Sequence, residues 1–173
     1  MQIVVSPVLP GERDALANLV EKYLYEFTLL DPDDVDDTGN YGYAYLDDYF
    51  KDERRWAYFF RVGGKLAGFC MVNNYAEPDD RPFDFCMCEF FVMHKYRRHG
   101  VGKQAFYEIL KRHSGVWKLG FHPKNPAAHF WKHCIAEKIP AGKIDFIHAY
   151  PTFTFGDGTH ADMFFFDCTA AKF

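Results

Sequence analysis

A basic, glycine-bearing turn between a predicted strand and a predicted helix gives the clearest chemical signal in this sequence. An apolar stretch that ends in Phe90–Val92 is followed by the pattern Arg97-x-x-Gly100-x-Gly102. Helical periodicity begins directly afterwards, with an apolar face made up of Val101, Ala105, Phe106, Ile109 and Leu110. The start of a helix presents unpaired N–H groups and the positive end of the helix dipole. The sequence therefore predicts an anion site here, of a kind that suits a diphosphate.

The residue types in the turn fit a phosphate ligand. Basic side chains add positive charge where the diphosphate would sit: Arg97, Arg98, His99 and Lys103. Glycine at positions 100 and 102 lets a ligand approach the backbone without meeting a Cβ atom. The turn is not the phosphate loop of nucleotide hydrolases, because no Gly-Lys-Ser/Thr follows it. The simpler alternative is that Gly100 only caps a turn and the basic side chains are solvated.

A second motif lies further along the chain, on a helix expected over Asn125–Ala136. It reads Asn125-Pro-Ala-Ala128-His-Phe130-Trp131. The two motifs together resemble the acyl-CoA-binding pattern of the GNAT acetyltransferases, in which Arg or Gln precedes two residues, Gly, one residue, and Gly or Ala. The chain is especially similar to bacterial members that carry Glu-Phe-Phe-Val, Tyr-Arg-Arg and a late Phe-Trp pair.

The resemblance covers nearly the whole chain and implies one GNAT domain over residues 1–173. Its fold would be α/β, with a central mixed, mostly antiparallel sheet flanked by helices. The expected elements follow this order: strand Ile3–Val8, helix Glu12–Leu30, short helix Tyr41–Lys51, a hairpin over Arg55–Asn73 around Gly63-Gly64, strand Phe83–Met93, helix Val101–His113, strand Gly115–Phe121, helix Asn125–Ala136, and strands Ile144–His148 and Ala161–Cys168.

The resemblance also implies acetyl-CoA as the acyl donor. Phe91, Val92 and Met93 would pair through their main chain with the pantetheine amides, and the backbone from Arg98 to Lys103, Val101 included, would hold the diphosphate. Arg98 stands where Gly is common in the family, so its side chain would point to solvent or to the 3′-phosphate of CoA.

Asn125, Phe130 and Trp131 would line the pantetheine arm and its thiol end. The aromatic pair comes one residue early relative to Asn125. Trp131 stands where a Tyr often protonates the leaving thiolate, and an indole N–H donates a hydrogen bond but is no acid near neutral pH. That acid would then be Tyr150 or a water molecule. Core packing is the alternative interpretation for Phe130 and Trp131.

Glu89 is the predicted general base. An alkyl amine has a pKa of about 10.4, so it is mostly protonated at pH 7 and must lose a proton before it attacks a thioester. An acid embedded in the apolar stretch Phe85–Met93 is costly unless it is used or paired. Strand alternation could instead turn Glu89 away from the ligand, or into a structural ion pair. Asp84 and His94 are weaker candidates.

Tyrosines and carboxylates gather in the predicted first helix and the segment after it. Members of this group are Tyr23, Tyr25, Glu26, Asp31, Asp33, Asp34, Asp36, Asp37, Tyr41, Tyr43, Tyr45, Asp47 and Asp48. A cationic amine favours such a mixture through ion pairing and cation–π contact, although a solvated acidic loop also accounts for Asp33–Asp37. The predicted acceptor is therefore a small, cationic primary amine. A non-catalytic acyl-CoA sensor or regulatory module is the alternative function.

The amino-acid composition argues against several other classes of protein. A formal charge of −4 argues against nucleic-acid binding. Five cysteines without a regular framework predict reduced thiols in a cytoplasmic protein, and no apolar run is long enough to span a membrane. Neither Cys86-x-Cys88 nor the pair His129 and His133 offers a full ligand set, so no metal is expected. The aromatic segment Tyr150–Phe155 could form a homodimer interface.

Overall fold

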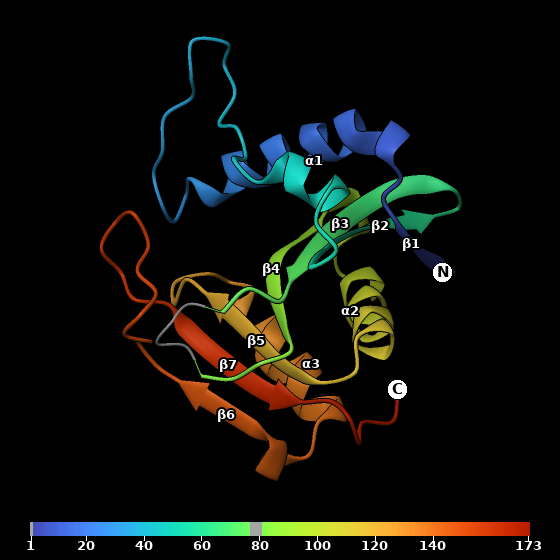
Figure 1. Ribbon diagram of the computed structural model, residues 1–173, viewed down its shortest axis with the longest axis vertical. Helices are drawn as coiled ribbons and strands as arrows, with labels where there is room; N and C mark the ends of the chain where they lie inside the picture. The colour runs from blue at the N-terminus through green and yellow to red at the C-terminus, as the bar shows by residue number, and fades with distance from the viewer. Residues whose placement is uncertain (1, 77–80) are drawn as a thin grey trace. The chain divides into compact units, whose positions relative to one another are not determined.

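The computed structural model describes residues 2–76 and 81–173. Their strands form a mixed, mostly antiparallel sheet in the order β1-β2-β3-β4-β5-β7-β6. The α-helices α1, α2 and α3 connect strands of this sheet (Figure 1). The predicted fold class is confirmed. The described residues form two compact units: residues 2–72 with 89–105, and residues 73–76, 81–88 and 106–173. β4 and α2 each contribute residues to both units.

The first unit contains β1 (Ile3–Pro7), α1 (Arg13–Phe27), β2 (Arg55–Val62), β3 (Lys65–Asn73, as far as Val72) and the end of β4 (Phe85–Val92). β2 and β3 form the predicted hairpin, and both turn residues, Gly63 and Gly64, have positive φ angles of 53° and 74°. Such angles favour glycine and match the twist of paired strands.

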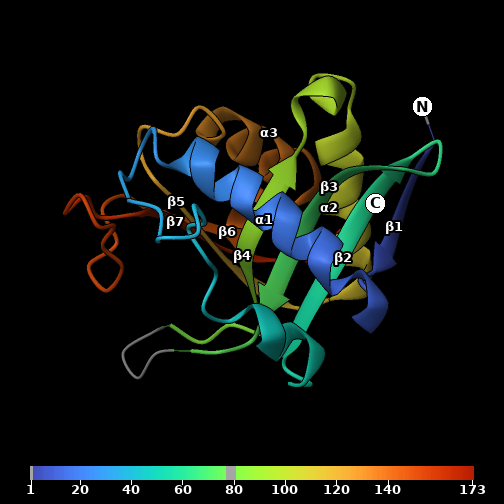
Figure 2. The same ribbon diagram turned by 90° about the horizontal axis from the view of Figure 1, so that it is seen from above.

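α1 packs its apolar face on β2 and β3, as Figures 1 and 2 show. Leu16, Leu19 and Val20 recur at helical spacing and are almost fully buried. They share a core with residues of the two strands and of β4: Ala57, Phe59, Phe69, Met71 and Phe91. Burial of a large apolar side chain contributes roughly 1.5–3 kcal/mol, so this core fixes α1 on the sheet.

The segment between α1 and β2 departs from the expected helix over Tyr41–Lys51. Only a short 3-10 helix, Leu46–Phe50, forms there. The N–H groups of Tyr41 and Gly42 are bound by the Glu21 carboxylate, and Gly42 has a φ of 72°. A left-handed residue of this kind interrupts a right-handed helix, so the tyrosines before Leu46 lie on a loop.

The second unit contains the start of β4, most of α2 (Val101–Arg112), β5 (Val116–Phe121), α3 (Ala128–Lys138), β6 (Ile144–Ile147) and β7 (Asp162–Asp167). β5 pairs with β7 in antiparallel fashion from Val116 to Phe121, and β7 pairs with the short strand β6. β4 and β5 are parallel, and their ladder joins Phe85–Met87 to Trp117–Leu119. Trp117, Phe106 and Phe166 are fully buried in this unit.

Candidate active site

The turn after β4 has the backbone shape that the sequence predicts. A 3-10 turn, His94–Tyr96, follows the strand, and α2 begins at Val101. Gly100 has a φ of 77°, and a Cβ atom there would meet only the Gln104 side chain, at 3.7 Å. Gly102 lies within the first turn of α2 and is half-buried. The start of a helix supplies backbone N–H donors to an anion, and α2 begins at this point of the turn.

Arg98 is the second left-handed residue of this turn, with a φ of 62°. Glycine adopts this conformation without steric cost, whereas a residue with a side chain, such as arginine, adopts it only at a cost. Arg98 and His99 are exposed, Lys103 is half-buried, and Val101 is buried. The exposed positions leave the Arg98 and His99 side chains on the surface of the turn, where an anionic ligand can reach them.

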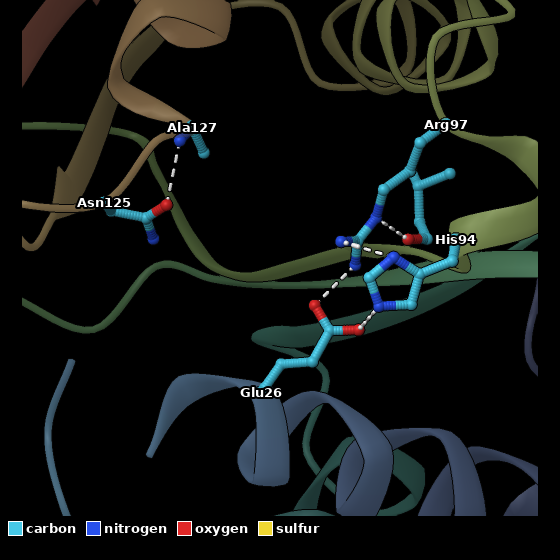
Figure 3. Close-up of polar contacts among 6 residues, drawn as sticks. Glu26, His94, Arg97, Asn125 and Ala127 are labelled. Atoms are coloured by element: carbon cyan, nitrogen blue, oxygen red, sulfur yellow. Dashed lines mark hydrogen bonds and ion pairs between the residues drawn. The ribbon is translucent and has the colours of Figure 1, made fainter. Parts of the chain in front are cut away.

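The side chain of Arg97 links the turn to α1 through an ion pair with Glu26 (Figure 3). Its Nη2 atom lies 2.7 Å from Glu26 Oε2, and its Nε atom donates to the Val92 carbonyl at 2.6 Å. His94 joins the cluster through its Nε2 atom, 2.9 Å from Glu26 Oε1. The Arg97 guanidinium also lies over the Phe91 ring, 5.5 Å from its centroid. The Arg97 side chain thus holds the end of β4 in place, and its backbone begins the turn.

The predicted pantetheine residues form the end of β4 and the start of the turn. Phe91 is buried, and Val92 and Met93 are half-buried. The Met93 N–H donates to the Ala67 carbonyl of β3 at 2.8 Å, so that donor is already used within the protein. β3 and β4 approach closely at Gly68, where a Cβ atom would lie 2.1 Å from the Phe91 carbonyl oxygen.

Glu89 points toward α1 and the loop that follows it. Its Oε1 atom accepts a 2.9 Å hydrogen bond from the Tyr43 hydroxyl, and the Tyr23 hydroxyl also bonds to the carboxyl group. Phe91, two residues further along β4, lies on the same face, with its ring 6.0 Å from that of Tyr23. Phe90, between them, packs on Phe60. Strand alternation therefore places Glu89 beside Phe91.

The surroundings of Glu89 make it a weak acid. Burial raises its pKa and the hydrogen bonds from Tyr23 and Tyr43 lower it; burial is the larger effect, so the pKa is raised from 4.5 to about 7. The residue nevertheless keeps partial contact with solvent. A carboxyl group with a pKa near 7 can accept a proton at neutral pH and give it up again, which is what general-base catalysis requires.

The first unit contains a hollow of about 740 Å³, whose lining includes Phe91 but not Glu89 or Tyr43. It is lined by α1, the following loop and the β4 end, through Glu21, Lys22, Tyr25, Glu26, Val35, Gly39, Asn40, Tyr41, Phe91, Met93, His94 and Lys95. Phe91 and Tyr41 each lie two residues from a member of the Glu89–Tyr43 pair. The volume is that of a small-molecule site.

The aspartates of the predicted acceptor region take other roles. Asp47 pairs with Arg13 at 2.7 Å, and this hydrogen bond and charge lower the Asp47 pKa. Asp36 accepts bonds from Thr38 and Asn40, which lower its pKa. Asp33, Asp34 and Asp37 are exposed. The structure thus brings Tyr25, Tyr41 and Glu26 to the hollow and Tyr23 and Tyr43 to Glu89, and it uses Asp36 and Asp47 in local structure.

Asn125, Phe130 and Trp131 belong to the second unit. The Asn125 side chain accepts a 2.9 Å bond from the Ala127 N–H, just before α3 (Figure 3). α3 therefore begins at Ala128, three residues later than expected. Trp131 is buried against Phe106 and Phe130, with ring centroids 5.4 and 4.8 Å away. Tyr150 is also buried, beside Phe165.

Two residues that shape the site had no clear signal in the sequence. Glu21 resembles any polar residue of an amphipathic helix, and its partners lie twenty residues further along the chain. Gly68 sits inside an apolar strand, where an isolated glycine suggests a close backbone approach. The glycine alone therefore suggests a close contact, but the sequence does not show that the partner backbone is that of Phe91.

Potential metal ligands, cysteines and long apolar helices can be assessed in the described part of the chain. Within residues 2–76 and 81–173, no group of three His, Cys, Asp or Glu side chains is placed to hold a metal ion. The five cysteines are free thiols. No helix among these residues has the length and apolar character needed to cross a membrane.

Comparison with known proteins places the chain in a family. The sequence model of the acetyltransferase (GNAT) family matches residues 19–134, and the chain belongs to this family. No curated protein sequence matches it significantly.

Solved structures share the fold at low sequence identity. A ribosomal-protein-S18-alanine N-acetyltransferase from Escherichia coli is 14% identical, with a TM-score of 0.60, and the alignment covers 99% of this chain and 97% of that one. An acetyltransferase from Thermus thermophilus is 14% identical, with a TM-score of 0.65 and coverage of 96% and 97%. A variant spermidine N-acetyltransferase from Vibrio cholerae is 11% identical, with a TM-score of 0.63 and coverage of 97% and 95%.

Proposed function

We propose that this protein moves the acetyl group of acetyl-CoA to a primary amine by direct attack, with Glu89 as the general base. The observation that carries the proposal concerns Glu89: burial raises the pKa of its carboxyl group to about 7, and it lies on the same face of β4 as Phe91, which lines a hollow of small-molecule size. Membership of the acetyltransferase family supports the reaction class.

The turn after β4 fits the diphosphate of CoA. It has two left-handed residues, Arg98 and Gly100, open space around Gly100, and the N-terminus of α2. Backbone N–H groups from Arg98 to Lys103 would hold the phosphates, with His99 and Val101 within this stretch and Gly102 allowing close approach. Phe91, Val92 and Met93 would border the pantetheine arm. The roles that the resemblance implies for Asn125, Phe130 and Trp131 stay predictions.

Acetyl-CoA supplies an activated acyl group as a thioester. The residues of the chain would supply the proton transfers and the binding surface. Glu89, ionised, takes one proton from the incoming ammonium, so that the amine nitrogen has a free electron pair with which to form the C–N bond. The C–S bond then breaks, CoA leaves as its thiolate, and the second proton lost by the nitrogen passes through water to that thiolate. Tyr23 and Tyr43 orient the carboxylate. Trp131 would contact the thiol end without protonating it, since an indole is no acid at neutral pH.

The lining of the hollow favours an acceptor with little positive charge beyond the reacting amine. Tyr25, Tyr41 and the carboxylates Glu21 and Glu26 suit an ammonium group. Glu26 is already paired with Arg97 and His94, however, and Lys22 and Lys95 line the same hollow. A polycation would meet these two lysines, so we infer a small primary amine that carries a single positive charge.

The direct test is release of free thiol from acetyl-CoA in the presence of a panel of primary amines, from monoamines to polyamines. We expect turnover that falls at least 100-fold in Glu89→Gln, with acetyl-CoA affinity unchanged. Acetyl-CoA binding without turnover on any amine, and with no effect of Glu89→Gln, would favour the alternative function of a non-catalytic acyl-CoA sensor. One feature is consistent with that alternative: Trp131 stands where a tyrosine would protonate the leaving thiolate.

A further inference from the structure

The loop between α1 and β2, here called the acceptor loop (residues 31–45), both lines the hollow and reaches Glu89. Val35, Gly39, Asn40 and Tyr41 contribute to the lining. Tyr43 contributes the hydroxyl group that donates to Glu89 Oε1. The position of this loop therefore decides the shape of the acceptor site and one of the hydrogen bonds of the proposed base.

One side chain of α1 holds the loop at the point where it turns toward Glu89. Glu21 Oε2 accepts the N–H of Tyr41, and Glu21 Oε1 accepts the N–H of Gly42, each at 2.9 Å. Both carboxylate oxygens are thus used on consecutive backbone donors. Gly42, with a φ of 72°, gives the backbone the bend that directs Tyr43 onward. Charge-assisted hydrogen bonds of this kind are stronger than neutral ones, and two together fix orientation as well as distance.

We propose that Glu21 is a positioning residue of the site: by holding the backbone of Tyr41 and Gly42, it places the Tyr43 hydroxyl on Glu89 and so favours the ionised, proton-accepting form of that carboxyl group. The catalytic consequence rests on the proposed role of Glu89 as base. The linkage itself, Glu21 to loop to Tyr43 to Glu89, is a property of the structure that is testable without any acceptor.

The groups that face Glu89 make the linkage specific. The titratable side chains that act on it are Tyr23, from α1, and Tyr43, from the acceptor loop. On the same face of β4 as Glu89, the Phe91 ring packs against the Phe69 ring of β3. Beyond the end of β4, the Arg97 guanidinium lies over the Phe91 ring and pairs with Glu26. Loss of one tyrosine bond therefore removes a large share of what stabilises the charged form.

Direct titration of the Glu89 carboxyl carbon by NMR tests this in the full chain. We expect Glu21→Gln to raise the Glu89 pKa by 0.5–1 unit, because glutamine has one acceptor oxygen and its NH2 group would face one of the two backbone donors. Tyr43→Phe should give a similar rise, and the double variant no more than either alone, since both changes break one linkage. Asp14→Asn, which removes an exposed charge from the same helix, should leave the titration unchanged.

The same variants separate this inference from the proposed function. A shift in the Glu89 titration that is not additive with Tyr43→Phe supports the linkage, even if no amine is ever acetylated. In an active enzyme, the rising limb of the pH profile of kcat/KM should move by the same amount. A Glu89 titration that is unaltered in Glu21→Gln, or shifts that add fully in the double variant, would overturn the inference. Tyr43→Phe, which removes only one hydroxyl group, provides the comparison if Glu21→Gln unfolds.

Discussion

The hydroxyl group of Tyr43 and the carboxyl group of Glu89, 46 residues apart in the chain, are joined by a 2.9 Å hydrogen bond. This contact links the acceptor loop to β4 at the position where the proposed chemistry needs a base. It also opposes the effect of burial, which raises the Glu89 pKa to about 7. The balance between the two effects sets the pH range in which the site can work.

Replacement of Tyr43 by Phe should lower activity at neutral pH and restore it at higher pH. Loss of the hydrogen bond destabilises the carboxylate, so the Glu89 pKa should rise. A rise of one unit, from about 7, would cut the ionised fraction at pH 7 about fivefold. The pH dependence of kcat/KM, measured by thiol release, checks this. A fall in activity that persists equally at pH 9 would show that Tyr43 acts through acceptor binding instead.

Stability should also depend on Glu89. Its folded-state pKa lies above its unfolded value, so the folded protein binds this proton more tightly, and the free energy of unfolding should fall as pH rises from about 4.5 to about 7. The full shift corresponds to about 3 kcal/mol, and the solvent contact of Glu89 reduces that figure. Urea unfolding at pH 5 and pH 8 should therefore show a smaller pH-dependent loss in Glu89→Gln than in the unaltered chain.

The close approach of β3 to β4 predicts a large cost for any side chain at Gly68. A Cβ atom there would lie 2.1 Å from the Phe91 carbonyl oxygen and 2.9 Å from the Phe60 ring. The strands would have to separate, so Gly68→Ala should lower the free energy of unfolding by about 3 kcal/mol. Gly11→Ala, at a position with nothing within 4 Å, is the matched control and should change stability by less than about 0.5 kcal/mol. Equal stabilities in chemical denaturation would refute the close packing.

Substitutions at Arg98 can distinguish the effect of its left-handed backbone conformation from the effect of its charged side chain. Glycine at this position relieves the steric cost of a φ of 62°, so Arg98→Gly should unfold no more easily, while Arg98→Val should lose about 1–2 kcal/mol. If the exposed guanidinium meets the 3′-phosphate, the unaltered protein should prefer CoA to 3′-dephospho-CoA, and Arg98→Gly should lose that preference. Binding titrations with both ligands measure it.

Local features of the site were predictable from the sequence, and long-range ones were not. The turn from Arg97 to Gly102 is encoded by neighbouring residues, so its strand, glycines and helix start are visible in the sequence. The short helix over Tyr41–Lys51 was predicted wrongly because Glu21, twenty residues earlier, binds the backbone that would have become its first turn. Arg97 was expected to add charge at the diphosphate, but Glu26, 71 residues away, takes its guanidinium. Partners of this kind are set by tertiary packing.

Calorimetric titration with acetyl-CoA tests the central claim most directly, because it needs no knowledge of the acceptor. Three proteins suffice: the unaltered chain, Gly102→Leu, and Gln104→Leu. Leucine favours helix at both positions, so neither change should weaken α2, but only a side chain at 102 would stand where the diphosphate is proposed to approach. The account predicts micromolar binding to the unaltered chain and to Gln104→Leu, and loss of binding in Gly102→Leu. Absence of binding to the unaltered chain, or full binding to Gly102→Leu, would contradict it.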